Sequence, residues 1–519
     1  MGVPTYFCGM FVRKKKNKSG VVSIQIIDKS SGEYRVCRTV GSSDDAAEVE
    51  RLYKKARKEI EIITGQQKLP LYFDKEKELV DIFFHSIEDF KLLGPELVLG
   101  KLFDEIGFCK IPDELFRYLV ITRLVYPVSK LKTVDYLFKY KGINMDVTKV
   151  YRYLDKLKTH HIQQIQQISY EHTLKALNHH LSIVFYDVTT LYFEAADEDD
   201  FRQTGFSKDS KHQQPQIVLG LLVSEGGYPL TYELFEGSKF EGHTMIPVIE
   251  AFKEKYQLGK LIVVADAGLL STKNIQALCE KNYEFILGAR IKNETEQVKQ
   301  CLLALKLDDG QSSIITKNDG QKLIVSYLTQ RAKNDAYNRK RGLQKLEKAL
   351  ASGKLTKQHI NNKGYNKYLR LEGEITIRID YDKYKDDEKW DGLKGYLTNT
   401  QLSKEDVIKS YKQLWFIEKT FRISKSDLRI RPIFHYVKRR IEAHICIAFA
   451  ACKLYKELER QLNEKKSGIS PEKAINILKT IYSITITTPY SHTKHMRLLI
   501  KNQEQSDLLK LFDLLRVSQ

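Results

Sequence analysis

The sequence has few of the residues that break or cross-link a chain. Its 519 residues include 28 Gly, 11 Pro and 7 Cys, and no two cysteines form a C-x-x-C pair. An odd number of scattered cysteines does not describe a disulfide framework, so we expect free thiols in a reducing compartment. With 42% hydrophobic and 29% charged residues, the chain is neither disordered nor fibrous, and its length allows roughly three or four domains.

Long apolar runs and nucleotide-binding motifs are also absent. No run approaches the ~18 residues that span a bilayer, and the N-terminus lacks the pattern of a secretory signal, so we expect a soluble intracellular protein. The motifs G-x-x-x-x-G-K-[ST], H-E-x-x-H and G-x-S-x-G do not occur. Their absence argues against a P-loop, a zincin and a hydrolase, and we expect no nucleotide cofactor and no membrane partner.

Positive charge is what the sequence has in excess. Lys and Arg number 85 against 66 Asp and Glu, which gives a formal net charge of +19 and a pI of about 9.2. Residues 331–370 contain 12 Lys or Arg and two acids, and residues 401–519 contain 23 and 12. This excess predicts a polyanionic partner, and a DNA affinity that falls steeply with salt.

The first 178 residues are expected to form a β-ribbon followed by helices. Apolar and polar residues alternate over 8–41, and Ser42-x-x-Asp45 is a capping box for the helix that follows. Within 129–157 the pattern predicts two short helices with a Gly between them. These fit either a helix-turn-helix or an ordinary helical hairpin.

From residue 181 the pattern changes to apolar runs separated by turns and helices, which is typical of an α/β domain. Gly226-Gly227 predicts a hairpin between the second and third runs. The runs that predict strands are 181–186, 216–223, 228–235, 261–265 and 283–289.

Two of these apolar runs end in an acid, LSIVFY in Asp187 and LIVVA in Asp266. Acids at the carboxyl ends of neighbouring parallel strands converge on the ligand crevice of an α/β sheet. A carboxylate pair is the simplest cage for Mg²⁺, which takes oxygen ligands. Taken singly, either Asp is better explained as a cap of the following loop.

A third acid, Glu418, lies in a predicted helix. Tyr411, Glu418 and Lys425 are spaced by seven residues, about two helical turns, so they share one stripe with Arg422. The stripe is either a solvated face with i,i+4 ion pairs or a metal ligand flanked by cations that bind phosphate. Trp415 is expected in the core.

Six short motifs lie between residues 181 and 455. They are YDVTT (186–190), GFSKD (205–209), VVADAGL (263–269), Tyr411-x2-Leu414-x3-Glu418-x6-Lys425, RPIFH (431–435) and EAHI (442–445). Together they resemble the DDE transposases of bacterial insertion sequences, in the group with a Y-x2-R-x3-E-x6-K signature and a β-strand insertion in the catalytic core. Leu414 replaces the signature Arg, and Leu269 replaces an aromatic residue; neither change removes a metal ligand.

The resemblance implies an RNase H-like fold in which Asp187, Asp266 and Glu418 are the catalytic and metal-binding acids. The cofactor it implies is a pair of Mg²⁺ ions, for which Mn²⁺ is an expected substitute. Such a site activates water to cut a phosphodiester and stabilises the departing 3′ oxygen. The freed 3′-OH then attacks a second phosphodiester, which joins the element to target DNA.

Five residues are expected to contact DNA. The resemblance gives this role to Tyr411 and Lys425, and Arg422 on the same stripe is expected to substitute for the missing signature Arg. Trp390 is a candidate for stacking on a flipped base, although a Trp that anchors a strand is the better explanation. Lys208 is a candidate in the loop after the first strand, where a plain surface loop is an equal alternative.

The resemblance also suggests the organisation of the chain and its partners. The expected partners are the transposon ends, target DNA and a second copy of the chain in a synaptic homodimer, at the nucleoid in a bacterial cytoplasm. Five parts are expected: an N-terminal β-ribbon and helical DNA-binding region (1–178), the first part of an RNase H-like core (179–290), a basic β-containing insertion (291–400), the last part of the core (401–460) and a helical C-terminal region (461–519).

The function these residues predict is that of a Mg²⁺-dependent cut-and-paste DNA transposase that binds terminal inverted repeats. One alternative is an RNase H-like nuclease that hydrolyses strands without joining them, which would not need the basic insertion. Another is a transposase-derived DNA-binding protein without catalysis, which would not need all three acids.

Overall fold

The computed structural model describes residues 9–64, 75–195, 197–207, 211, 213–269, 271–361, 364–372, 376–488 and 491–515. It divides into two compact units. The first comprises Met1–Glu88 with Ile486–Lys494, and the second comprises Asp89–Thr485 with His495–Gln519.

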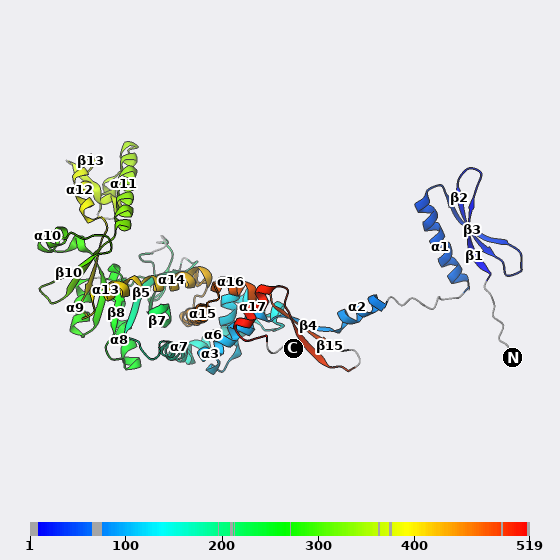
Figure 1. Ribbon diagram of the computed structural model, residues 1–519, viewed down its shortest axis with the longest axis horizontal. Coiled ribbons are helices and arrows are strands. Elements are labelled where there is room, and N and C mark those ends of the chain that lie inside the picture. Colours follow the sequence, from blue (N-terminus) through cyan, green and yellow to red (C-terminus); the bar gives the residue numbers. More distant parts are fainter. Residues whose placement is uncertain are drawn as a thin grey trace. The chain divides into compact units, whose positions relative to one another are not determined.

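Three antiparallel strands and a long helix form the centre of the first unit (Figure 1). The helix packs Val49 and Ala56 against Ile24 and Ile26 of the middle strand. The predicted β-ribbon is therefore confirmed, with one strand more than a simple hairpin. The elements are β1 (Met10–Lys16), β2 (Val22–Asp28), β3 (Arg35–Ser43), α1 (Ala46–Thr64) and α2 (Lys75–Ser86).

The start of α1 differs from the predicted capping box. The Asp45 carboxylate accepts hydrogen bonds from the backbone N–H groups of Ala47 and Glu48. Ser42 instead donates its hydroxyl to Ser23 of β2, so it cannot cap the helix. The prediction is wrong because Ser42 lies within β3, where its side chain faces the neighbouring strand.

An eight-stranded mixed sheet forms the centre of the second unit, in the order β10-β11-β14-β9-β8-β5-β6-β7 (Figure 1). The pairs β5–β8 and β8–β9 are parallel and the other pairs are antiparallel. All five strands predicted between 181 and 289 are present, and the chain is a mixed α/β protein. The strands are β5 (Ile183–Tyr192), β6 (Gln216–Ser224), β7 (Pro229–Glu236), β8 (Ile262–Ala265), β9 (Glu284–Ala289), β10 (Ser312–Thr316), β11 (Lys322–Tyr327) and β14 (Leu393–Thr398).

Both faces of this sheet are covered by helices. Successive side chains of a strand point to opposite faces, so Phe185 and Val264 belong to one apolar cluster and Val184 and Val263 to the other. The first cluster includes side chains of α13, α14 and α15, and the second includes side chains of α8 and α9. The covering helices are α8 (Met245–Tyr256), α9 (Thr272–Glu280), α13 (Lys404–Lys412), α14 (Trp415–Arg422) and α15 (Lys438–Glu464).

The chain between β9 and α13 adds strands to the central sheet and also forms helices and a two-stranded sheet outside it. β14 pairs with β9, and β11 pairs with β14, so this region extends the central sheet. Most of the basic stretch 331–370 forms a 23-residue helix and the turns after it. The remaining elements are α10 (Glu296–Ala304), α11 (Thr329–Ala351), β12 (Leu369–Glu372), β13 (Thr376–Ile379) and α12 (Tyr381–Asp386). The division into five parts stays a prediction.

The pair of helices expected within 129–157 is present, with Gly142 between them at φ 68°. α6 buries Val150, Leu154 and Leu157 in the same cluster as α15. The predicted helical C-terminus also contains two strands. The elements are β4 (Ile87–Leu92), α3 (Lys101–Ile106), α4 (Glu114–Val125), α5 (Lys130–Lys141), α6 (Val147–His160), α7 (Ile162–Ala176), α16 (Pro471–Leu478), β15 (Tyr482–Thr487), β16 (Lys494–Leu499) and α17 (Gln503–Leu511). No helix in the described part of the chain has the length and apolar character needed to cross a membrane.

The close approach of β6 to Tyr186 yields a stability prediction. A Cβ at Gly220 would lie 2.5 Å from the Tyr186 hydroxyl oxygen, which is buried and donates a hydrogen bond to Thr244. Gly220→Ala should therefore lower the free energy of unfolding by about 1–3 kcal/mol through overpacking. Thermal unfolding measures the effect, and Gly259→Ala, where a Cβ meets open space, is the control. An equal melting temperature for the two variants would contradict the prediction.

Candidate active site

Asp187 and Asp266 occupy neighbouring positions on adjacent strands. In the parallel pairing of β5 with β8, Tyr186 lies opposite Ala265; Asp187 is the next residue of β5, and Asp266 directly follows β8. Alternation places both on the sheet face that bears Phe185 and Val264. The sequence predicted that the two acids follow neighbouring parallel strands, and the pairing of β5 with β8 confirms that these strands are adjacent and parallel.

The prediction that β5 ends at Asp187 is wrong. β5 continues to Tyr192, because its other edge pairs with β6 as far as Gln216. Asp187 is thus held inside a strand, half-buried, and its Oδ1 accepts a 2.8 Å hydrogen bond from the N–H of Val188. Asp266 directly follows β8 and is exposed.

Tyr411 of α13 holds the second acid. Its hydroxyl donates a 2.8 Å hydrogen bond to Oδ1 of Asp266, and its side chain is buried. A Cβ at Gly288, on the neighbouring strand β9, would overlap this hydroxyl, so a glycine is needed there. Burial raises the pKa of Tyr411, and the charges of Asp266 and Glu418 raise it further. Tyr411 therefore stays protonated and keeps donating at neutral pH.

The predicted single helix through the third acid is interrupted. α13 ends at Lys412 and α14 begins at Trp415. Between them, backbone N–H groups bond to the carbonyl three residues back, as in Leu414 to Tyr411. This tighter turn changes the angle per residue, so the seven-residue spacing no longer describes one stripe. Lys425 lies beyond α14, in the π-helix η10 (Ile423–Asp427).

Glu418 and Arg422 are both exposed on α14, one turn apart. Lys425 is half-buried. The expectation that Trp415 lies in the core is wrong, because its side chain is 50% exposed. Its ring packs on Phe416, with centroids 4.1 Å apart, while Ile417 and Phe421 fill the core side of α14.

Lys394 of β14 is a residue that the sequence reasoning missed. Its Nζ lies 4.5 Å from the centroid of the Tyr411 ring. Burial lowers the pKa of Lys394 and Arg331 lowers it further, whereas Asp266 and Glu418 oppose that fall. Lys394 thus lies over the ring of the tyrosine that bonds to Asp266. Only the pairing of β14 with β9 brings Lys394 there, and no sequence motif marks it.

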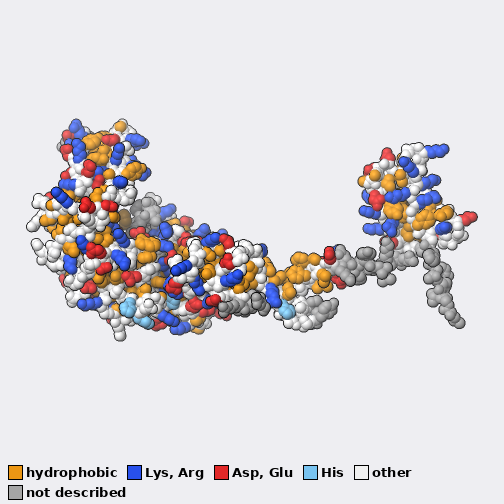
Figure 2. Space-filling view, viewed as in Figure 1, with side chains coloured by type: hydrophobic (Ala, Val, Ile, Leu, Met, Phe, Trp, Pro, Cys, Tyr) orange, Lys and Arg blue, Asp and Glu red, His pale blue; other side chains and the backbone are white. Residues whose placement is uncertain are grey.

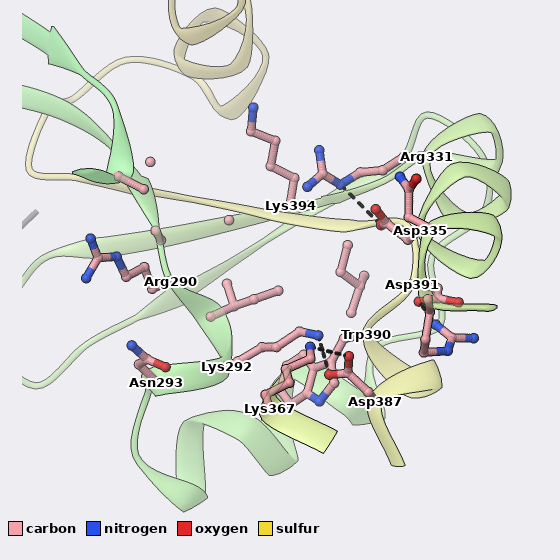
Figure 3. A pocket seen from close by; sticks show the side chains of 18 of the residues that line it. Arg290, Lys292, Asn293, Arg331, Asp335, Lys367, Asp387, Trp390, Asp391 and Lys394 are labelled. Atoms are coloured by element: carbon pink, nitrogen blue, oxygen red, sulfur yellow. Dashed lines mark hydrogen bonds and ion pairs between the residues drawn. The ribbon is translucent and has the colours of Figure 1, made fainter. Parts of the chain in front are cut away.

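A cavity of about 780 Å³ extends from Asp266 and Tyr411 to the segment between β9 and β14 (Figure 3). Trp390 lines it but is only 8% exposed, in an apolar cluster with Ile291 and Leu323, which favours its role as an anchor. Lys208 lies outside the described residues. The basic side chains that line the cavity are Arg290, Lys292, Arg331, Arg339, Lys367 and Lys394.

The donor set suits a hard divalent cation. Carboxylate oxygens are the ligands that Mg²⁺ prefers, and the strand register brings two carboxyl side chains to adjacent positions. Among the described residues, however, no three His, Cys, Asp or Glu side chains are already gathered as metal ligands. Asp187 and Asp266 thus lie at neighbouring register positions and Glu418 lies on α14, so the fit to a cation rests on the chemistry of carboxylate oxygens.

The chain has distant likenesses among solved structures. The piggyBac transposase synaptic complex with hairpin DNA is 10% identical, with a TM-score of 0.37, and the match covers 77% of this chain and 79% of that one. The Mos1 transposase paired-end complex with left transposon end is 12% identical, with a TM-score of 0.15, and the match covers 33% and 56%. With TM-scores below 0.5, neither likeness establishes a common fold.

No curated protein matches the chain. The family model described as the transposase DDE domain matches residues 178–453, which is more than half of the chain. The matched segment includes Asp187, Asp266 and Glu418. The chain therefore belongs to the transposase DDE domain family.

Proposed function

We propose that this chain is the transposase of a bacterial insertion sequence, in the group with the Y-x2-R-x3-E-x6-K signature. It binds the terminal inverted repeats of its element, cuts DNA strands and joins them to target DNA. The observation that carries the proposal is the register of β5 and β8, which sets Asp187 beside Asp266 within the segment that matches the family. The catalytic acids are Asp187, Asp266 and Glu418.

An RNase H-like core is the fold we propose for residues 179–290 and 401–460. The strand order β7-β6-β5-β8-β9 supports it, because three antiparallel strands are followed by two strands parallel to the first. The chain between β9 and α13 is the proposed insertion.

Asp187, Asp266 and Glu418 would hold the Mg²⁺ that the family implies, in this proposal as two ions that Mn²⁺ can replace. When bound there, the metal supplies Lewis-acid activation of a phosphodiester and neutralises charge that develops on its oxygens. The hydrogen bond from the Tyr411 hydroxyl to Oδ1 of Asp266 fixes the orientation of this carboxylate before a ligand binds.

Cations around the acids would hold the DNA strand. Lys394 borders Asp266, Arg422 lies one turn after Glu418, and Lys425 follows in η10. Because each carries a positive charge, together they offset the charge of the phosphate that is cut. Tyr411 positions Asp266 and therefore acts through it. Lys208 stays a proposed DNA contact, whereas the burial of Trp390 favours its role as an anchor.

The basic surface supports DNA as the partner. The chain has a net charge of +19, and Figure 2 shows Lys and Arg side chains scattered among acidic and hydrophobic ones on the visible face of each unit. We infer binding to transposon ends and target DNA at the nucleoid, by a homodimer in the synaptic complex. No nucleotide cofactor enters the proposal.

Substitution of each acid tests the proposed chemistry. Asp187→Ala, Asp266→Ala and Glu418→Ala should each reduce Mg²⁺-dependent cleavage about 10²-fold or more, because each removes a ligand of the metal that would stabilise charge at the reacting phosphate. Binding of the same DNA without metal should stay largely intact. The assay uses purified full-length protein, a labelled fragment with the sequences that flank the gene, and a supercoiled target.

Asp427→Ala is the matched control, because Asp427 is an exposed acid in η10. Normal cleavage by Glu418→Ala would contradict the assignment of Glu418 as the third catalytic acid. Specific binding by the wild-type chain without cutting would indicate an idle DNA-binding protein, and cutting without joining would indicate a nuclease.

Removal of the Tyr411 hydroxyl tests how Asp266 is positioned. Tyr411→Phe should raise the Mg²⁺ concentration needed for half-maximal cleavage, by roughly 10- to 100-fold, because the carboxylate loses its partner. Calorimetric titration with Mn²⁺ should show the same weakening without any reaction. Tyr396→Phe is the control, since Tyr396 lies in the same apolar cluster as Tyr411 but its hydroxyl faces Ser326. If Tyr411→Phe weakened only DNA binding, Tyr411 would be a DNA contact instead.

A further inference from the structure

A second cavity lies in the helical part of the second unit. Its volume is about 360 Å³, and it shares no lining residue with the cavity at Asp266. Arg123 near the end of α4, Lys130 at the start of α5, His444 of α15 and the segment 429–435 form its wall. None of these residues has a role in the proposed chemistry.

Two cations of the wall, Arg123 and Lys130, are buried. Arg123 is 6% exposed and Lys130 is 5% exposed. Among the described residues that line the cavity, none is Asp or Glu. Within the described part of the chain, Arg123 makes one hydrogen bond, at 3.5 Å to the carbonyl of Leu428, and Lys130 makes no ion pair. Asp155 of α6 is already bonded to two arginines of α15.

Buried cations of this kind are costly unless an anion completes the site. Burial lowers the pKa of Arg123 to about 10, and burial together with Arg123 lowers the pKa of Lys130. The two histidines of the wall are neutral imidazoles and do not balance the charge. Burial and the same two cations lower the pKa of His435 to about 3, and burial likewise lowers the pKa of His444. The cavity wall therefore has an excess of positive charge that a negative ligand would neutralise.

Three further features describe the ligand. Ser129 caps α5, so the positive end of that helix points at the cavity beside Lys130. Arg429 and Lys132 line the cavity and are exposed, which gives a charged entrance. Phe434 also lines it with 62% of its side chain exposed, and such a ring offers a stacking surface for a base.

We propose that this cavity binds a phosphate group, and that in the assembled complex the group belongs to the backbone of a DNA strand. The identification of DNA rests on the proposed function, whereas the phosphate site rests on Arg123 and Lys130 alone. A free phosphate or a small phosphorylated molecule has the same chemistry. The exposed Phe434 favours DNA, because its ring can stack on a base, which a free phosphate lacks.

Lys130→Met tests the phosphate site in the full-length chain. Inorganic phosphate should raise the melting temperature of the wild-type protein and should not raise that of Lys130→Met. Without phosphate or sulfate, the variant should melt no lower than the wild type, because it removes an unpaired buried charge. Lys479→Met, a half-buried lysine outside the cavity, should keep the phosphate effect. Lys132→Ala changes an exposed wall residue and should weaken the effect whatever Lys130→Met does to folding.

Binding of a labelled DNA duplex without metal tests the source of the phosphate. Lys130→Met should bind DNA roughly tenfold more weakly, and the slope of log affinity against log salt should shrink by about one. Phe434→Ala should weaken DNA binding but leave the effect of inorganic phosphate unchanged.

Each outcome separates the site from the function. An unchanged phosphate effect in Lys130→Met and Lys132→Ala overturns the site, while cutting by the wild type still upholds the transposase. Loss of the phosphate effect with unchanged DNA affinity and salt slope overturns DNA as the occupant and leaves a small phosphorylated ligand. A wild-type chain that binds no DNA contradicts the proposed function. The melting experiment with inorganic phosphate then still shows whether the cavity binds phosphate.

Discussion

The parallel pairing of β5 with β8 is the constraint on which the candidate site depends. A shift of one residue in this register would move one of the two acids to the opposite face, which α8 and α9 cover. The register is held by alternating side chains that fill both apolar layers, such as Phe185 on one side and Val184 on the other. The core of the second unit therefore sets the position of Asp187 and Asp266.

Tight packing around the second acid links the sheet to α13. The Tyr411 hydroxyl reaches Asp266 only because Gly288 leaves room for it, and Lys394 lies over the ring of the same tyrosine. Both acids and cations line the larger cavity. The smaller cavity has the opposite character, since its buried cations lack an acid among the described residues. Of the three proposed catalytic acids, only Asp266 lines the larger cavity.

Local pattern was enough to predict the five strands between 181 and 289, because their apolar runs are visible in the chain itself. It also predicted that Asp187 and Asp266 follow neighbouring parallel strands, but it ended β5 too early. It predicted one helix through Tyr411 and Glu418, where the structure has a tight turn whose hydrogen bonds depend on packing. It also put Trp415 in the core, although that side chain is half-exposed. The sequence did not reveal Lys394, or the buried pair Arg123 and Lys130, because segments distant in sequence form the cavities that these residues line.

The most direct test of this account is where a divalent metal sits on the protein. Fe²⁺ can replace Mg²⁺ and, with peroxide and a reductant, generate hydroxyl radicals that cut the backbone close to the bound ion. The account predicts cuts in β5 near Asp187, after β8 near Asp266 and in α14 near Glu418, all suppressed by excess Mg²⁺ and absent from Asp187→Ala. Cuts confined to other segments, or cuts unchanged in Asp187→Ala, would contradict it.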